Sequence, residues 1–133
     1  MFFHSYKEAH QKLQIKGSYQ RGTIGNDQEG ITSLKLTENP KSYDRIQGDL
    51  RQIWYVGKGK KSSQGEPAID QRQEEQTPFF RSLELGNEFP ILMKLKPSLV
   101  VFLGYYRVVQ VRKKKTLKNI HYFEIELHRA RLP

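Results

Sequence analysis

The stretch NIHYFEIELHRA, residues 119–130, alternates between two kinds of side chain with a period of two residues. Phe123, Ile125 and Leu127 fall on one side of this pattern. The other side carries Tyr122, Glu124, Glu126 and His128. Successive side chains of a β-strand point to opposite faces of its sheet, so this period predicts a strand with one buried face.

Further segments predict more strands and two short helices. Thr77 is the expected N-cap of the second helix, with Pro78 at its first helical position and Gly86 just after its end. A glycine-rich loop that can include a short strand is expected at 17–30, and Gly104 is expected to form a bulge or bend. The expected strands are 31–36, 51–57, 89–96, 99–114 and 119–130, and the expected helices are 5–13 and 77–87. Many short strands with two small helices predict a single α+β domain, built as a curved sheet or a partly open β-barrel.

The charge of the chain favours a polyanionic partner. Its 133 residues include 23 Lys and Arg against 14 Asp and Glu, a net charge of +9. Nucleic acid is the commonest polyanion in a cytosol. The chain has no cysteine, which removes disulfide and thiolate chemistry and agrees with a cytoplasmic, nucleoid-associated protein. No apolar run is long enough to span a membrane, and the N-terminus has no signal-peptide pattern.

Catalytic patterns are weak. The four histidines are scattered, which argues against a metal site, and GKGKK at 57–61 lacks the spacing of a phosphate-binding P-loop. Asp70, Glu74 and Glu75 lie close together in the sequence and could hold Mg²⁺ in a small nuclease. We therefore expect no catalytic residue, metal or cofactor, and keep the small nuclease as a distant alternative.

Aromatic and basic residues meet in IWYVGKGKKSSQGEPAIDQRQ, residues 53–73. A phosphate cradle, a hairpin tip and a nucleobase pocket could each begin with such a stretch. Aromatic faces stack on unpaired or flipped bases, while lysine and arginine hold phosphates. For any single aromatic residue, packing in the core is the simpler explanation.

The order of three blocks resembles the SRA (SET and RING-associated) domain family, whose members read modified cytosine by flipping it out of DNA. The first block is GTIGNDQEGITSLKLTENPKSYD, and the second runs from WYVGKG through DQ to RSLELGNEFPILMKL. The third block joins FLGYYRVVQVRKKK to HYFEIELHR. The likeness covers about Gly22 to Arg129 and implies a PUA-like β-barrel.

The resemblance implies a base pocket formed by Tyr43, Asp44, Asp49, Trp54, Tyr55, Val56 and Gly57. Two aromatic rings sandwich the flipped base in the family, and Tyr43 and Tyr55 match that pair in order and spacing. Asp44, with Asp49 as second candidate, would accept a hydrogen bond from the cytosine amine. Asp70 and Gln71 are expected to brace the loop from behind. Val56 stands where the family commonly has Thr, and Leu103 where it has Asp, so the preferred modification and flanking sequence stay open.

The resemblance also implies how the domain meets DNA and what acts on it. Loops 17–30 and 58–68 are the expected groove-entering elements. The expected contacts to the DNA backbone and grooves are Arg21, Thr23, Lys58, Lys60, Lys61, Lys113, Lys114 and Lys115. The partner would be duplex DNA with a modified base, read by a monomeric domain with a fused or partner nuclease or NTPase, as in modification-dependent restriction. An RNA-binding PUA-like module is the main alternative.

Overall fold

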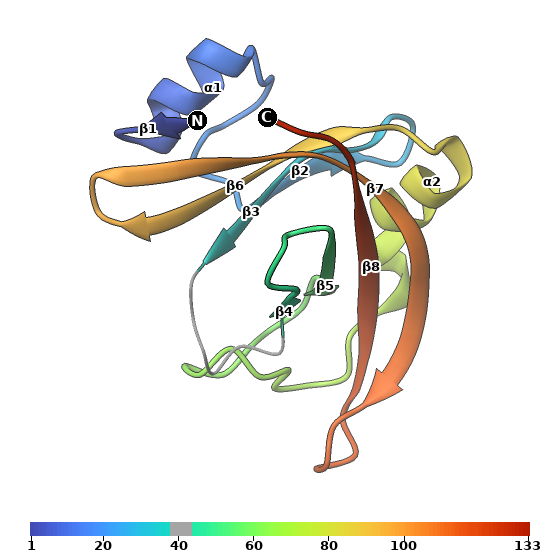
Figure 1. Ribbon diagram of the computed structural model, residues 1–133. Coiled ribbons are helices and arrows are strands. Elements are labelled where there is room, and N and C mark those ends of the chain that lie inside the picture. The colour runs from blue at the N-terminus through green and yellow to red at the C-terminus, as the bar shows by residue number, and fades with distance from the viewer. Residues whose placement is uncertain (38–43) are drawn as a thin grey trace.

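The computed structural model describes residues 1–37 and 44–133. Figure 1 shows a strongly curved sheet with two helices packed against it. In chain order the elements are β1 (Phe2–Phe3), α1 (Tyr6–Leu13), β2 (Thr23–Asn26), β3 (Gly30–Thr37), β4 (Arg45–Ile46), β5 (Gln52–Val56), the short 3₁₀ helix η1 (Gln73–Gln76), α2 (Thr77–Leu85), β6 (Phe89–Lys96), β7 (Leu99–Lys115) and β8 (His121–Arg131). The predicted fold class, an α+β domain with a partly open barrel and two short α-helices, is confirmed.

The strand order explains how a cavity can form between distant segments. The eight strands form one mixed sheet in the order β2-β3-β6-β7-β8-β5-β4, with β1 also paired to β7. β3 and β6 run parallel, whereas β5 pairs antiparallel with β8. β2 and β5 therefore lie near opposite edges of the sheet. Because the sheet curves round (Figure 1), these edges face each other across the opening of the barrel, where Thr23 and Tyr55 come into contact.

The long strand β7 produces much of this curvature. The pairing of β6 with β7 shifts by one residue where Ile91 faces Gly104 and Leu92 faces Phe102, so the expected irregularity at Gly104 is confirmed. Gly104 has a φ of +120°, and a Cβ there would lie 2.6 Å from the carbonyl oxygen of Arg131. A side chain at this position would clash with the end of β8, since no real Cβ approaches backbone so closely.

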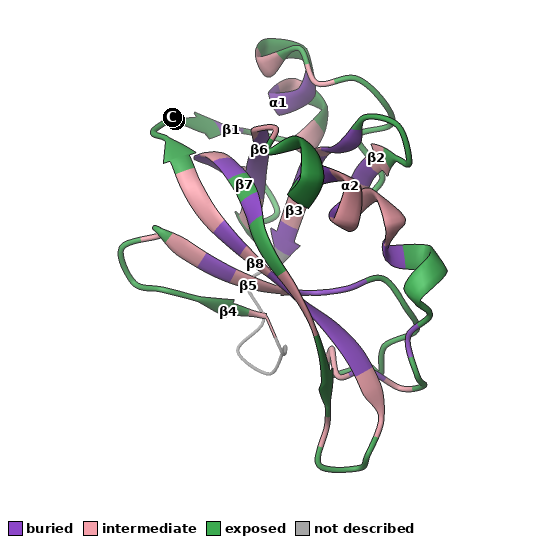
Figure 2. Cartoon of the chain, turned by 90° about the vertical axis from the view of Figure 1, so that its right-hand side faces the viewer, coloured by how far each residue is buried: buried purple, intermediate pink, exposed green. Residues whose placement is uncertain are grey.

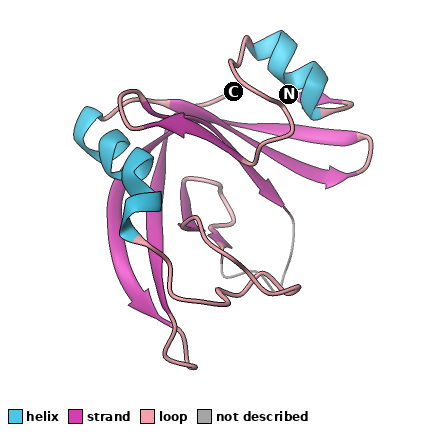
Figure 3. Cartoon of the chain, turned by 180° about the vertical axis from the view of Figure 1, so that it is seen from behind, coloured by secondary structure: helices cyan, strands magenta, loops and turns pink. Residues whose placement is uncertain are grey.

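The main core fills the space between the curved sheet and α2. Its buried residues include Ile53, Phe79, Phe89, Tyr106 and Ile125. In Figure 2 buried positions recur along the strands, while the C-terminal end of α2 is exposed. A smaller apolar cluster lies under α1, on the opposite face of β6 and β7, and Figure 3 shows α1 on that outer side of the sheet. The alternation predicted for β8 is correct, because Phe123, Ile125 and Leu127 all belong to the main core.

One local prediction is wrong at the boundary of an element. Thr77 is not the N-cap of α2: Gln76 occupies that position, and Thr77 already lies inside the helix. The reason is that η1 runs directly into α2, so the Thr77 hydroxyl donates to the carbonyl of Glu74 instead. The strand predicted at 99–114 is β7, which extends one residue further to Lys115. Gly86 ends α2 in the left-handed conformation, as predicted.

Within the described residues no helix is long and apolar enough to cross a membrane. In the same part of the chain, no group of three or more His, Cys, Asp and Glu side chains could hold a metal ion.

Candidate base-binding site

A cavity of about 360 Å³ opens where the two edges of the curved sheet approach each other. It is lined by Arg21, Gly22, Thr23, Tyr55, Lys58, Gly59 and Lys61. One wall comes from the segment that leads into β2, and the other from the end of β5 and the loop after it. The structure thus brings together five of the residues predicted from the sequence, namely Arg21, Thr23, Tyr55, Lys58 and Lys61.

Tyr55 is the aromatic wall of this cavity. Its hydroxyl lies 3.2 Å from the hydroxyl oxygen of Thr23, and its ring packs 6.0 Å, centroid to centroid, from the ring of Phe79 in α2. Burial is the main reason why the pKa of Tyr55 is raised, so the phenol stays neutral and can hydrogen-bond at physiological pH. These two contacts hold the ring in one orientation.

Lys61 is a cation that lies over that ring. Its ammonium nitrogen lies 6.0 Å from the centroid of the Tyr55 ring, at the outer limit of a cation–π contact. Burial lowers the pKa of Lys61, while the negative charge of Asp44 raises it. A ligand that stacked on this side of Tyr55 would meet the Lys61 ammonium group first.

Asp44 lies beside this group and is bonded to β5. Its Oδ1 accepts a hydrogen bond of 2.8 Å from the backbone N–H of Val56. Its charge also acts on Tyr55 and on Lys61. The structure therefore brings Asp44, the first candidate for reading the edge of a base, close to the cavity.

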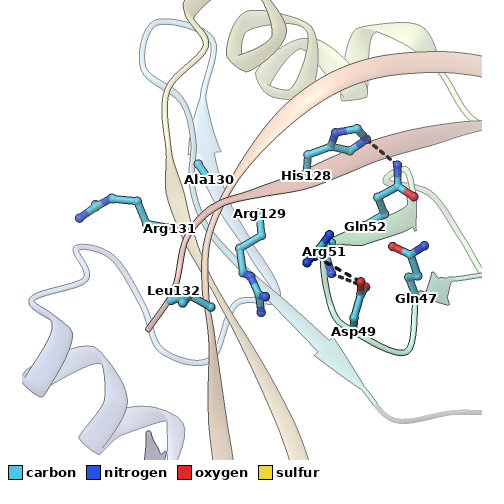
Figure 4. Close-up of a pocket in the computed structure, with 9 residues that line it drawn as sticks. All are labelled: Gln47, Asp49, Arg51, Gln52, His128, Arg129, Ala130, Arg131 and Leu132. Atoms are coloured by element: carbon cyan, nitrogen blue, oxygen red, sulfur yellow. Dashed lines mark hydrogen bonds and ion pairs between the residues drawn. The ribbon is translucent and has the colours of Figure 1, made fainter.

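Asp49, the second candidate, lies in a different hollow. This hollow, of about 600 Å³, shares no lining residue with the Tyr55 cavity. Figure 4 shows Asp49 paired with Arg51, whose Nε lies 3.3 Å from Asp49 Oδ2. The Asp49 carboxylate also accepts a hydrogen bond from the backbone N–H of Arg51. The structure does not bring Asp49 to Tyr55.

The other predicted pocket residues support the cavity or lie apart from it. Trp54 alternates with Tyr55 along β5, so it points to the opposite face of the sheet, where the guanidinium carbon of Arg45 lies 4.7 Å from the centroid of its ring system. Val56 is buried and contributes its N–H to Asp44. Tyr43, the proposed second half of the aromatic sandwich, lies outside the described residues.

The loop after β5 is held by two buried glutamines. Gln71 donates from Nε2 to the carbonyl of Gly57 at 2.9 Å and accepts from the N–H of Phe123 in β8. Gln76 binds both the N–H and the carbonyl of Lys58, at 2.8 Å and 2.6 Å. Asp70 accepts from the backbone N–H of His121. The prediction that Asp70 and Gln71 brace the loop is confirmed.

Nothing in the sequence indicates that Gln76 holds the loop. It lies in the polar run QRQEEQ, which contains no pattern that marks one glutamine as buried. A Cβ on Gly57 would lie 2.6 Å from Gln76 Oε1 and 2.9 Å from Gln71 Oε1. Gly57 therefore allows the backbone to approach the two glutamines, and it is not part of the cavity wall.

The remaining cations lie on the loop and on the β7–β8 hairpin. Lys60 is exposed, and its carbonyl accepts from the N–H of Ala68, which folds the loop back on itself. In the register of β7 with β8, the three lysines at 113–115 lie opposite Phe123, Tyr122 and His121 respectively. Lys114 already has a partner, since its ammonium lies 3.4 Å from the Glu124 carboxylate.

The acidic residues of the alternative nuclease site are not gathered into one group. The Asp70 carboxylate bonds to the backbone of β8, whereas Glu74 and Glu75 are exposed on η1. Glu74 lies 3.7 Å from the Nε of Arg72.

Comparisons with known proteins identify the fold. No family model matches the chain, and no curated protein matches it either. Among solved structures, the SUVH5 SRA domain bound to fully hydroxymethylated CG DNA superposes with a TM-score of 0.76 and 19% identity, over 97% of this chain and 87% of that one. The modification-dependent restriction endonuclease TagI superposes with a TM-score of 0.74 and 20% identity, over 96% of this chain.

The comparison also covers parts of longer proteins. KRYPTONITE in complex with mCHG DNA and SAH superposes with a TM-score of 0.77 and 14% identity, over 100% of this chain. This chain spans 32% of the KRYPTONITE chain and 48% of the TagI chain. The open, curved sheet with its two helices is therefore that of an SRA-like domain, within the wider PUA-like group of α+β folds.

Proposed function

We propose that this domain binds duplex DNA carrying a modified base, and that the base leaves the duplex and enters the Tyr55 cavity. The observation that carries the proposal is the cavity itself, in which an oriented aromatic ring lies among Arg21, Lys58 and Lys61. The fold supports it, because SUVH5 SRA structures contain methylated or hydroxymethylated DNA.

Stacking on the Tyr55 ring provides the free energy that stabilises a flipped base. Extruding a base costs a few kcal/mol of stacking and pairing, least where the pair is already weakened. Stacking on an aromatic side chain returns about 1–3 kcal/mol per base. Tyr55 offers such a ring at a fixed angle, since its hydroxyl contacts Thr23 and its ring packs against Phe79.

A modified cytosine is the base that these groups fit best. Asp44 can accept a hydrogen bond from the exocyclic amine of cytosine, which is a donor at the edge of the base. Its Oδ1 accepts from the Val56 N–H, which fixes the carboxylate that we assign to the edge of the base. Lys61 can move from the Tyr55 ring towards a phosphate as the base enters.

The cations around the cavity supply affinity that does not depend on sequence. Arg21, Lys58 and Lys61 line its mouth, and Lys60 is exposed beside them. Each phosphate that they neutralise releases counterions, which makes binding fall with rising salt concentration. Binding by this part of the surface should therefore be salt-dependent but indifferent to modification.

Another module would act on the DNA once this domain has bound it. We propose that the domain is a monomeric, non-catalytic reader in a cytoplasmic, nucleoid-associated protein that carries or recruits a nuclease or NTPase. TagI supports this proposal, because it is a restriction endonuclease in which the segment similar to this chain makes up 48% of the length.

One binding panel tests the proposal. Identical duplexes would carry cytosine, 5-methylcytosine, 5-hydroxymethylcytosine, N4-methylcytosine or N6-methyladenine at one position, with matched RNA as competitor. We expect one modified cytosine to bind most tightly, and 2-aminopurine beside it to brighten as the base is extruded. Equal affinity for all five duplexes would refute modified-base reading, and stronger binding of RNA would favour the PUA-like RNA module.

A further inference from the structure

The β7–β8 hairpin projects beyond the rest of the domain, as both Figure 1 and Figure 2 show. Its strands stay paired as far as Lys115 and His121. The turn is held by hydrogen bonds from the N–H of Thr116 to the carbonyl of Ile120, and from the N–H of Asn119 to the carbonyl of Thr116. Asp70, in the loop after β5, accepts a hydrogen bond from the N–H of His121, where the paired strands end and the turn begins. The hairpin is therefore an ordered arm attached to the loop that borders the Tyr55 cavity.

The two faces of this arm differ in charge. On one face Arg112 lies 2.7 Å from Glu126, and Lys114 lies 3.4 Å from Glu124. Lys113 and Lys115 point to the other face, because side chains alternate along a strand. Among the described residues neither of them forms an ion pair, and nor does Lys118 in the turn. One face and the tip of the arm therefore carry positive charge that no carboxylate compensates.

The sequence around the arm strengthens this asymmetry. Residues 89–123 contain no aspartate or glutamate. Leu117, at the tip, is fully exposed, with a relative accessibility of 105%. Turns favour Gly, Asn, Asp, Pro and Ser, each for its backbone geometry, so a leucine at this position has no local structural role in the turn. It is an apolar contact point surrounded by lysines.

We propose that this hairpin is a second DNA-binding arm, which enters the major groove of the duplex whose modified base is held at Tyr55. Lys113, Lys115 and Lys118 contact phosphates, and Leu117 contacts the C5-methyl group of a thymine at the floor of the groove. The inference rests on the proposed function, because it takes the same duplex as ligand. The major groove is about 12 Å wide and admits a two-stranded β-ribbon, and the thymine methyl group is exposed only there.

The length of the arm limits where this contact falls. Tyr55 pairs with Ile125 in β8, and Lys118 lies seven residues before Ile125 in the sequence. A strand rises about 3.4 Å per residue, and the duplex rises about 3.4 Å per base pair. The thymine contacted by Leu117 therefore lies within about seven base pairs of the modified base. This contact gives the domain a preference in flanking sequence that the cavity alone does not provide.

The phosphate contacts are tested by the salt dependence of binding. Replacing Lys113, Lys115 and Lys118 by Gln should lower the slope of log K against log salt by up to about 2.7, from about 0.9 per lost contact. The matched control replaces Lys7, Lys12 and Lys16, which removes the same charge from the helix α1 and its end, at the opposite end of the molecule (Figure 1). The control should leave the slope nearly unchanged. Equal slopes for the two triple variants would overturn the proposal.

The methyl contact is tested by replacing single thymines with deoxyuridine, which removes only the methyl group. Across the seven flanking base pairs, we expect one position at which deoxyuridine weakens binding of the parent about fourfold, the effect of one buried methyl group. Leu117→Ala should bind thymine and deoxyuridine equally at that position, with an unchanged melting temperature. A parent that is indifferent to deoxyuridine at every position would overturn the role of Leu117.

The tests of the hairpin can be distinguished from the test of the proposed function. The proposed function is tested by the ratio of the affinities for modified and unmodified duplexes. A parent with no such preference, but with the expected hairpin effects, would leave the arm intact and refute base reading. A parent with a clear preference, but with unchanged salt slope in the hairpin variant, would refute the arm alone. A hairpin that binds a partner protein and not DNA would give this unchanged salt slope.

Discussion

Tyr55 combines two contributions that substitutions can separate. Its hydroxyl contacts Thr23 across the opening of the sheet, and its ring contacts Phe79. The ring is the part that we propose to stack on the base. Phe at this position would keep the ring and lose the hydroxyl, whereas Ala would lose both.

We therefore predict that Tyr55→Phe keeps the preference for modified DNA and lowers stability by about 1 kcal/mol, the value of one hydrogen bond. Tyr55→Ala should reduce binding of modified DNA to the level of unmodified DNA, since about 1–3 kcal/mol of stacking is lost. The measurements are thermal melts and affinities for the paired duplexes. A folded Tyr55→Ala protein that discriminates like the parent would show that the base binds elsewhere.

Asp44 offers a second test at the level of one residue. Asp44→Asn keeps the oxygen that accepts from the Val56 N–H, so the fold should be preserved. The change removes the charge and places a donor where the cytosine amine needs an acceptor. Discrimination should fall by about 1–3 kcal/mol, the range for a good base contact.

Asp49→Asn is the matched control, because Asp49 pairs with Arg51 in the other hollow. It should leave discrimination unchanged. If only Asp49→Asn reduced this discrimination, Asp49 and not Asp44 would read the edge of the base. Removal of the Asp44 charge should also lower the pKa of Lys61 further, because that charge now raises it.

At the level of elements, the loop after β5 depends on the contact between a glycine and two glutamines. Gly57→Ala would place a Cβ 2.6 Å from Gln76 Oε1 and 2.9 Å from Gln71 Oε1. Both glutamines are buried and hold the backbone of the loop, so neither can move without breaking a hydrogen bond. We predict a loss of about 1–3 kcal/mol in the free energy of unfolding, as for other overpacked sites.

The comparison is Gly48→Ala, since a Cβ at Gly48 meets nothing within 4 Å and its φ is not positive. Urea unfolding of the two variants measures the difference. Equal stabilities would mean that Gln71 and Gln76 do not fix the loop that borders the Tyr55 cavity.

The elements also show what could be predicted from the sequence. The period of two located β8 and its buried face, and Pro78 and Gly86 located α2. The contact between Thr23 and Tyr55 could not be predicted, because it joins opposite edges of a sheet whose curvature depends on the whole structure. Burial of Glu124 could not be predicted either, since the pattern assigns it to the polar face and says nothing of the Arg45, Arg112 and Lys114 side chains that surround it.

At the scale of the whole molecule, the net charge of +9 brings some cations close together, and their repulsion lowers the free energy of unfolding. Lys35 and Lys94 both approach the ring of Tyr6, at 4.6 Å and 4.9 Å from its centroid. Lys35 also donates to the carbonyl of Tyr19. Burial, and then the charge of Lys94, lower the pKa of Lys35 to about 8.

This shift predicts how stability depends on pH. The folded state binds fewer protons than the unfolded state between pH 8 and about 10, so the free energy of unfolding should rise with pH across that interval. Above pH 10 the raised pKa of Tyr6 acts in the opposite direction, because the unfolded tyrosine ionises first. Urea unfolding at several pH values would measure the rise, and Lys35→Met should reduce it to the part that comes from Lys61, whose pKa is also lowered by burial. A rise of the same size in that variant would assign it to another group.

The pairing of β5 also has a consequence for the synthesis of the protein. Every residue that lines the Tyr55 cavity lies within the first half of the sequence, yet β5 is held in the sheet by β8, the last of the eight strands, and by the two-residue β4. On the ribosome, Tyr55 and its strand must wait for β8 to emerge before they have a sheet to join. A messenger truncated before His121 would encode the complete set of cavity residues but no cavity, and its product would present an unpaired strand to chaperones and proteases.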